Sequence, residues 1–245
     1  MTTPGAVRPL AGLDFSATNG EFYMSFHDSE KIMNPSSFSN EVREFLRDER
    51  VSLGTMFLRE AYDCIVEVGC HDGHNASWLA QLCSRYIGVD INEYAIRRAK
   101  QRSDNPENGD FFYAPIERVM SLVQSSDSAG ARTAVLFPFN LFGNFVDIVG
   151  LIKLLDLRGV DLVMANFNNK APTTIGRYLY YVNCFGSEGI RVYEAEQGVL
   201  FRAGQKFQSI AYNPDYLSSV IHKISSYHGI LTPFSRYGYL FILTK

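Results

Sequence analysis

The residues best suited to chemistry follow a short apolar run from Cys64 to Val68. Gly69 comes directly after this run, and Gly73 follows four residues later. A second apolar run, residues 86–89, stops at an acidic residue, Asp90. Glycines let the backbone approach a ligand closely, and a carboxylate at a strand tip can accept two hydrogen bonds from a ribose diol. The pattern predicts a site for a nucleoside-containing cofactor, although an ordinary turn with a capping Asp90 would give the same spacing.

These residues need a strand, a turn and a helix to position them. The run from Cys64 to Val68 is rich in β-branched residues, and residues 75–82 carry apolar side chains at helical spacing. Residues 93–102 have the pattern of a further helix after the second strand. A helix that begins just beyond a glycine loop offers unpaired N–H groups to a ligand. We therefore expect a strand–turn–helix–strand unit with the cofactor at its turn.

The motif Glu67-Val-Gly69-Cys-His71-Asp-Gly73 resembles the first motif of class I S-adenosylmethionine-dependent methyltransferases, E/D-x-G-x-G-x-G, with His71 in place of the middle glycine. The resemblance implies that the loop holds the methionine part of S-adenosylmethionine, that Asp90 holds its ribose, and that the product is S-adenosylhomocysteine. The position that often carries an acidic residue for adenine is Pro115 here, which leaves backbone groups and apolar contact for that ring. The expected cofactor-binding residues are Tyr23, Glu67, Gly69, Cys70, His71, Gly73, Asp90, Ile91, Pro115, Ile116 and Phe137.

The rest of the chain is consistent with the α/β fold of that superfamily. We expect a Rossmann-like parallel sheet with an antiparallel terminal strand, helices on both faces, and a small antiparallel β-meander insertion. Three parts are expected: an N-terminal helical cap (residues 1–60), the cofactor-binding domain (61–169 and 213–245), and an inserted helix and meander lid (170–212). Two helices are predicted in the cap, over 39–50 and 53–62, and one over 145–155. The meander strands are predicted at 190–195, 199–203 and 206–212, and a terminal hairpin at 230–234 and 237–244.

The stretch from Pro138 to Asn144 places amides, phenylalanines and a glycine beyond the carboxyl end of the predicted strand 133–137. In open α/β sheets the ligand crevice lies at such ends, and buried amides supply both donors and acceptors. We expect a substrate site here, although Asn140 would serve equally well as the cap of the helix 145–155. The expected substrate-binding residues are Asn140, Phe142, Asn144, Arg177 and Tyr181.

Methyl transfer is an in-line displacement at a sulfonium, so the protein mainly positions the acceptor and excludes water. A general base is needed only where the acceptor arrives protonated. The candidate catalytic residues are His27, His71, Asn140 and Tyr178. No metal is expected, because Asp147 and the asparagines of residues 166–169 do not have a convincing ligand spacing.

Composition narrows the function classes. The chain has 245 residues, 46% hydrophobic and 20% charged, with a net charge of −3, which gives no electrostatic reason to expect a nucleic-acid partner. Four cysteines without a CxxC pair, no signal-peptide pattern and no apolar span predict a cytoplasmic protein without a membrane partner. The layout is similar to amino-sugar N-methyltransferases and glycine/sarcosine methyltransferases, which implies methyl transfer to nitrogen or oxygen of a small metabolite. An RNA or protein methyltransferase, or a non-catalytic cofactor-binding homologue, remains the alternative, and a homodimer is possible.

Overall fold

The structure is a computed structural model that describes residues 20–115, 117–119, 131–145, 147–204 and 206–245. Ile116, one of the expected cofactor residues, lies outside the described residues. Within the described part, no helix is both long enough and apolar enough to cross a membrane.

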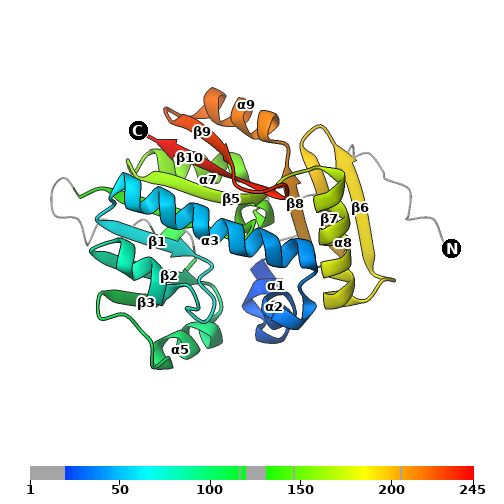
Figure 1. Cartoon of the computed structure of the whole chain (residues 1–245), viewed down its shortest axis with the longest axis horizontal. Helices are drawn as coiled ribbons and strands as arrows, with labels where there is room; N and C mark the ends of the chain where they lie inside the picture. Colours follow the sequence, from blue (N-terminus) through cyan, green and yellow to red (C-terminus); the bar gives the residue numbers. More distant parts are fainter. Residues whose placement is uncertain (1–19, 116, 120–130, 146, 205) are drawn as a thin grey trace.

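A seven-stranded sheet with the order β3-β2-β1-β4-β5-β10-β9 forms the centre of the molecule (Figure 1). The first five strands run parallel, and β10 is antiparallel to both of its neighbours. β1 and β4 are buried along their whole lengths, as strands of a parallel sheet covered on both faces should be. The strands are β1 (Cys64–Val68), β2 (Arg85–Asp90), β3 (Gly109–Tyr113), β4 (Thr133–Phe137), β5 (Asp161–Phe167), β9 (His228–Pro233) and β10 (Gly238–Thr244). The expected Rossmann-like sheet with an antiparallel terminal strand is confirmed.

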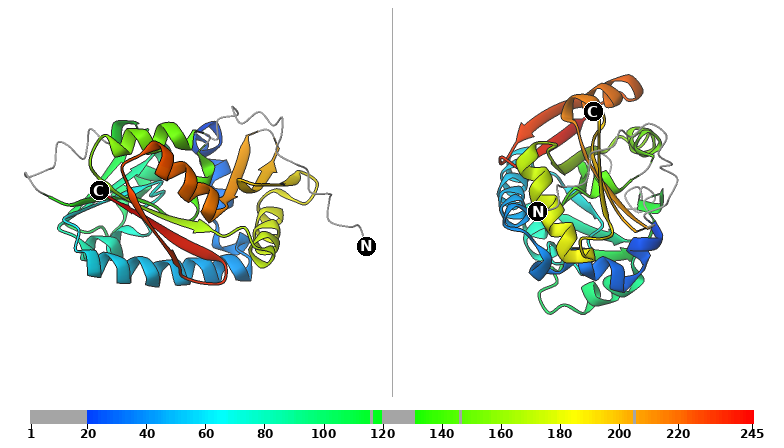
Figure 2. Two further views of the ribbon diagram at one scale, coloured as in Figure 1. Left: turned by 90° about the horizontal axis from the view of Figure 1, so that it is seen from above. Right: turned by 90° about the vertical axis from the view of Figure 1, so that its right-hand side faces the viewer.

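Helices cover both faces of this sheet and make three layers (Figure 2). One face packs against α3 (Asn40–Glu60), α4 (Ala76–Leu79) and α5 (Glu93–Gln101), with the 3₁₀ turn η2 (Ala80–Leu82) continuing α4. The other face packs against α7 (Ile148–Asp156) and α9 (Pro214–Ile224). The 3₁₀ turn η3 (Leu141–Asn144) links β4 to α7 and joins the same core.

The helical stretches predicted over 39–50 and 53–62 are confirmed, but the break between them is wrong, because α3 runs continuously from Asn40 to Glu60. Gly54 costs the helix about 1 kcal/mol relative to alanine. Leu53, Met56 and Phe57 are buried on both sides of it, and burying each such side chain stabilises by about 1.5–3 kcal/mol. The stabilisation from burying these side chains therefore exceeds the destabilisation caused by Gly54.

The helix predicted from residue 145 begins three residues later, at Ile148. Asp147 caps it, since its side chain accepts a hydrogen bond from Gly150 N. The alternative in which Asn140 caps this helix is therefore wrong.

The predicted meander forms a sheet of its own beside the main one. Its strands are β6 (Ile190–Ala195), β7 (Gly198–Ala203) and β8 (Phe207–Tyr212), preceded by α8 (Ala171–Phe185). A separate core joins α8 and this sheet to two short N-terminal helices, α1 (Gly20–Met24) and α2 (Phe26–Met33), and η1 (Pro35–Ser37) follows them. Figure 1 shows α1 and α2 at the carboxyl ends of the parallel strands, between the two sheets.

Candidate functional site

The glycine loop after β1 alternates between ordinary and left-handed backbone conformations. Gly69, His71 and Gly73 have φ of 68°, 50° and 75°. At Gly69 a Cβ atom would lie 2.7 Å from the end of the Leu141 side chain, which would have to shift to admit a larger residue. His71 adopts the backbone conformation that glycine favours at the middle position of the motif. The substitution leaves the loop in the shape that the motif needs.

Position 71 should therefore distinguish glycine from a β-branched residue. We expect His71→Gly to be more stable than His71→Val by about 1–2 kcal/mol, the cost of placing an L side chain in the left-handed region. Urea unfolding of the two variants measures this difference. Equal stabilities would contradict a left-handed residue at this position.

Asp90 stands at the carboxyl end of β2 and holds the loop. Its Oδ2 accepts from His71 N and its Oδ1 accepts from Asn92 N, each at 2.8 Å. Burial raises the pKa of Asp90, while the hydrogen bonds from the Asn92 and His71 amides oppose that rise. An ionised carboxylate has about four acceptor sites, so the backbone amides leave acceptor capacity for a ribose hydroxyl. Asp90 fits the ribose-binding role that the motif implies.

Glu67 lies beneath the loop and is fully buried. Its Oε1 accepts from Asn75 Nδ2 at 2.7 Å, and its Oε2 accepts from the Tyr86 hydroxyl. Both carboxylate oxygens are therefore used to fix the end of the loop to β1 and β2. These contacts indicate that Glu67 supports the loop and is not free to bind a ligand through its carboxylate.

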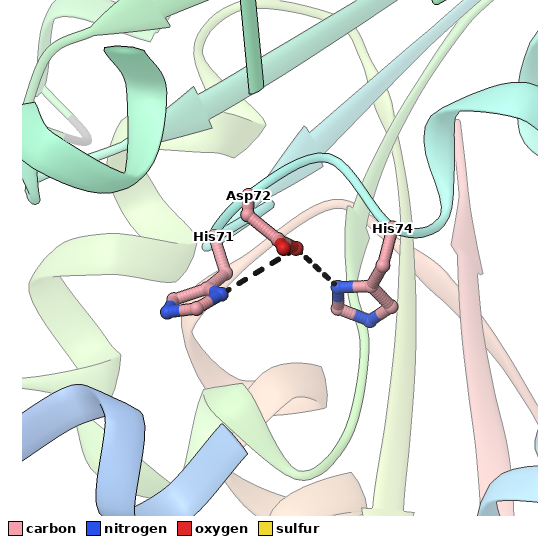
Figure 3. Close-up of side chains that lie close together, drawn as sticks. All are labelled: His71, Asp72 and His74. Atoms are coloured by element: carbon pink, nitrogen blue, oxygen red, sulfur yellow. Dashed lines mark ion pairs between the residues drawn. The ribbon is translucent and has the colours of Figure 1, made fainter. Parts of the chain in front are cut away.

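His71, Asp72 and His74 face one another in the same loop (Figure 3). Asp72 Oδ1 lies 3.6 Å from His71 Nδ1 and 3.4 Å from His74 Nδ1. Hydrogen bonds from both histidines hold the pKa of Asp72 well below its usual range. The other carboxylate oxygen lies 3.5 Å from Arg98 and 3.7 Å from Arg102, and these guanidinium groups would repel a cation. The cluster is better described as an ion-pair network than as a cation site.

The N-terminal helices are tied to this loop and to the end of β2. Asn92 Nδ2 donates to Tyr23 O and Ser29 Oγ, both at 3.1 Å, while its Oδ1 caps α5. Glu30 on α2 lies 3.4 Å from His71 Nε2 and 3.1 Å from Arg98 Nη1. We name α1 and α2 together the N-terminal cover. Sequence reasoning missed Asn92, although an asparagine directly before a helix is a recognisable cap signal.

The cover brings Tyr23 to the carboxyl ends of the strands. Its hydroxyl hydrogen-bonds with the Asn144 side chain, and it interacts electrostatically with Tyr181 and Asp90. Burial, together with the nearby Tyr181 and Asp90, raises the pKa of Tyr23 well above its usual value, while the Asn144 hydrogen bond opposes that rise. The phenol therefore keeps its proton at neutral pH and can donate a hydrogen bond.

The chain turns sharply after β4, where Phe139 and Asn140 both have left-handed φ, 47° and 56°. Glu49 on α3 supports the turn, because its Oε1 accepts from Phe139 N at 2.7 Å. Burial and the nearby Glu67 carboxylate raise the pKa of Glu49 to about 8, although the Phe139 hydrogen bond opposes the rise. Sequence reasoning missed Glu49, because on a helix its spacing resembles that of surface charges.

The amide of Asn140 is used within the protein. Its Nδ2 donates to Ile210 O (3.0 Å) and Ser209 Oγ (3.2 Å), and its Oδ1 accepts from Phe167 N (3.0 Å). Asn140 therefore ties the end of β4 to β5 and β8, and its amide is already occupied where a substrate contact was expected.

Arg177 lies in the core between α8 and the small sheet instead of facing a crevice. Its guanidinium donates to Val199 O, Ser209 O and Ser209 Oγ, and it is 1% exposed. Tyr181 is buried beside it, with the Arg177 guanidinium 5.7 Å from its ring centre. The aromatic wall that α8 was expected to present to the substrate is thus interior packing in this structure.

The remaining expected site residues differ in how far they are buried. Phe137 and Phe142 are fully buried, with ring centres 5.6 Å apart, and Cys70 is buried in the loop. Ile91 is half-buried after β2, whereas Pro115 is exposed. Tyr178 is half-buried on α8, and His27 is exposed on α2. The structure therefore gathers Tyr23, His71, Asp90 and Asn144 near one another and leaves His27 on the surface.

Residues 65–139 match a family model described as a methyltransferase domain. The matched segment runs from β1 through the turn after β4 and includes the glycine loop and Asp90. No curated protein sequence matches the chain.

Three solved structures illustrate the fold similarity. One is the Burkholderia thailandensis 1,6-didemethyltoxoflavin-N1-methyltransferase with bound 1,6-didemethyltoxoflavin and S-adenosylhomocysteine (TM-score 0.55, 10% identity, 93% of this chain and 86% of that chain). Another is the plantazolicin methyltransferase BpumL with a monoazolic desmethylPZN analog and SAH (TM-score 0.55, 12% identity, 94% of this chain and 95% of that chain). The third is the magnesium protoporphyrin IX methyltransferase of Synechocystis PCC 6803 with bound SAH (TM-score 0.54, 12% identity, 92% of this chain and 97% of that chain). Because the sequence identities are only 10–12%, the similarity to these structures shows the fold alone.

Proposed function

Because this chain contains a class I S-adenosylmethionine-dependent methyltransferase domain, we propose that it transfers a methyl group from S-adenosylmethionine to a nitrogen or oxygen atom of a small metabolite. One observation carries the proposal. The left-handed glycine loop and the Asp90 carboxylate meet at the carboxyl ends of β1 and β2, joined by the His71 N–Asp90 hydrogen bond.

The residues present fit the cofactor. Asp90 would hold the ribose with its remaining acceptor capacity, and the Gly69–Gly73 loop would receive the methionine part. Pro115, Ile91 and Phe137 would contribute apolar contact, and Tyr23 from the N-terminal cover would close the site. When bound, S-adenosylmethionine supplies an activated methyl group on a sulfonium, and the protein supplies position and exclusion of water.

The described side chains favour an acceptor that needs no strong general base. The high pKa of Tyr23 makes its hydroxyl a hydrogen-bond donor, and His27 is exposed on α2. Tyr23 and Asn144 would orient a polar group of the acceptor. A neutral amine or heterocyclic nitrogen, which carries a free lone pair at neutral pH, suits such a site.

A small acceptor is favoured over RNA or protein. The net charge is −3, whereas RNA-binding surfaces are strongly basic. The strand ends are covered by α1, α2 and the small sheet (Figure 1), which would admit a compact molecule more readily than a polymer.

The test is transfer of labelled methyl from S-adenosylmethionine to a panel of amines, phenols, carboxylic acids, an RNA oligonucleotide and a protein mixture. We expect label in at least one small molecule and none in the polymers. Labelled RNA or protein would overturn the small-molecule assignment. Binding of the cofactor without transfer to any class would favour the non-catalytic alternative.

A further inference from the structure

Two buried asparagines lie at the carboxyl ends of neighbouring strands, and their amides are used very differently. Asn140, after β4, uses both its donor and its acceptor atoms within the protein. Asn166, the penultimate residue of β5, is 0% exposed, yet neither its Oδ1 nor its Nδ2 has a hydrogen-bond partner among the described residues. A buried polar group without a partner lowers folding stability, so its presence needs an explanation.

Asn166 lies near the carboxyl end of β5, and its place on the strand determines which face of the sheet its side chain lies on. Side chains alternate along a strand, so Asn166 faces the same side as Met164, which belongs to the core shared with α7 and α9. It pairs across the ladder with Tyr239 of β10, and Met164 pairs with Phe137 of β4. The turn η3 and the strand β8 contact β5 at this end. Asn166 is therefore a polar group in an otherwise apolar and aromatic part of the site.

We propose that the Asn166 carboxamide binds the methyl acceptor, and that the acceptor presents a neutral, planar, amide-like edge such as a lactam or a carboxamide. This inference rests on the methyltransferase function proposed above. A carboxamide offers a donor and an acceptor in one plane, and a group with the complementary pair satisfies both.

The neighbours of Asn166 determine the rest of the acceptor's chemistry. Phe137, Met164 and Tyr239 carry no charge, and a charged group placed among them would lose its hydration without compensation. Aromatic side chains pack well against a flat ring. Because Asn166 is fully covered, the acceptor reaches it only when one of the elements packed against β5, such as η3 or β8, moves.

The test compares Asn166→Leu with Asn140→Leu in the full-length chain saturated with S-adenosylhomocysteine. The probes are uracil, 2-pyridone and nicotinamide, which carry an amide edge, and phenol and aniline, which do not. Calorimetry gives the affinity for S-adenosylhomocysteine, and the melting temperature reports both stability and probe binding.

We expect Asn166→Leu to bind S-adenosylhomocysteine as the wild type does and to melt at the same or a higher temperature. At least one amide-edged probe should bind the wild type and bind Asn166→Leu roughly 10- to 100-fold more weakly, as loss of hydrogen bonds in a buried site requires. Asn140→Leu should melt at a lower temperature, because it removes the acceptor of Phe167 N and the amide donor to Ile210 O and Ser209 Oγ.

Three results would overturn the assignment. If Asn166→Leu melted as low as Asn140→Leu, the amide would be structural. If no amide-edged probe bound a wild type that holds S-adenosylhomocysteine, or if such a probe bound Asn166→Leu equally well, the acceptor contact would be refuted. A wild type that did not bind S-adenosylhomocysteine would instead refute the proposed function itself, together with this inference.

Discussion

Replacing Asp90 with alanine is expected to weaken binding of S-adenosylmethionine by about 1.5–3 kcal/mol, roughly 10- to 150-fold in the dissociation constant. That is the typical strength of hydrogen bonds to a charged acceptor, and the Asp90 carboxylate retains acceptor capacity for a ribose. The same substitution leaves His71 N and Asn92 N without their 2.8 Å acceptors, so the glycine loop should loosen as well. Calorimetric titration measures the affinity, and thermal melting measures the loosening.

The matched control is Asp110→Ala on the neighbouring strand β3. Asp110 is exposed and pairs only with Arg85 among the contacts described, at 3.0 Å. We expect its removal to leave the affinity unchanged. An Asp90→Ala protein with wild-type affinity would remove Asp90 from the cofactor site.

Glu49→Gln is expected to stabilise the protein at neutral pH. It should also make the free energy of unfolding depend less on pH between pH 5 and 8. The pKa of Glu49 rises from 4.5 to about 8 on folding, so between these values the folded state holds a proton that the unfolded state has released. Stability from this group is therefore fully present below the unfolded pKa and is lost as pH rises through about 8. A rise of 3.5 units (8 − 4.5) at 1.36 kcal/mol each corresponds to several kcal/mol, about 5 at most.

The glutamine variant keeps an oxygen acceptor for Phe139 N, so it isolates the effect of the charge. Glu49→Ala also removes that acceptor and should lose about 1–3 kcal/mol relative to the glutamine variant. Glu44→Gln on the same helix, a partly exposed residue paired with Arg236, should change stability by less than about 1 kcal/mol. Urea unfolding from pH 5 to 9 provides the curves. A pH slope that is the same in the wild type and in Glu49→Gln would mean that the Glu49 carboxylate is ionised in the folded protein.

The sequence pattern predicts the cofactor half of the site because its signals are local. A β-branched run, two spaced glycines and an acidic strand end determine β1, the loop and Asp90 without knowledge of distant contacts. The left-handed conformation of His71 is a finding of the structure, since the sequence departs from the motif's glycine at this position.

The acceptor half depends on contacts between residues far apart in the chain, and local patterns do not contain them. Asn140 and Asn166 both lie at strand ends, so the sequence does not distinguish them. The packing of β8 and η3 makes the difference: the Asn140 amide is hydrogen-bonded within the protein, whereas the Asn166 amide has no described partner. Glu49 sits on a helix whose outer face is charged, so its burial beneath the turn at Phe139 could not be read from spacing. The expected break in α3 between residues 50 and 53 was wrong for the same reason, since burial against the sheet outweighs helix propensity.

Calorimetric titration of the wild-type chain with S-adenosylmethionine tests the cofactor site most directly. We expect one molecule bound per chain and an increase in melting temperature that Asp90→Ala reduces and Asp110→Ala leaves unchanged. A folded wild-type protein that gave neither heat of binding nor a change in melting temperature would contradict the assignment of the Gly69–Gly73 loop and Asp90 as a cofactor site.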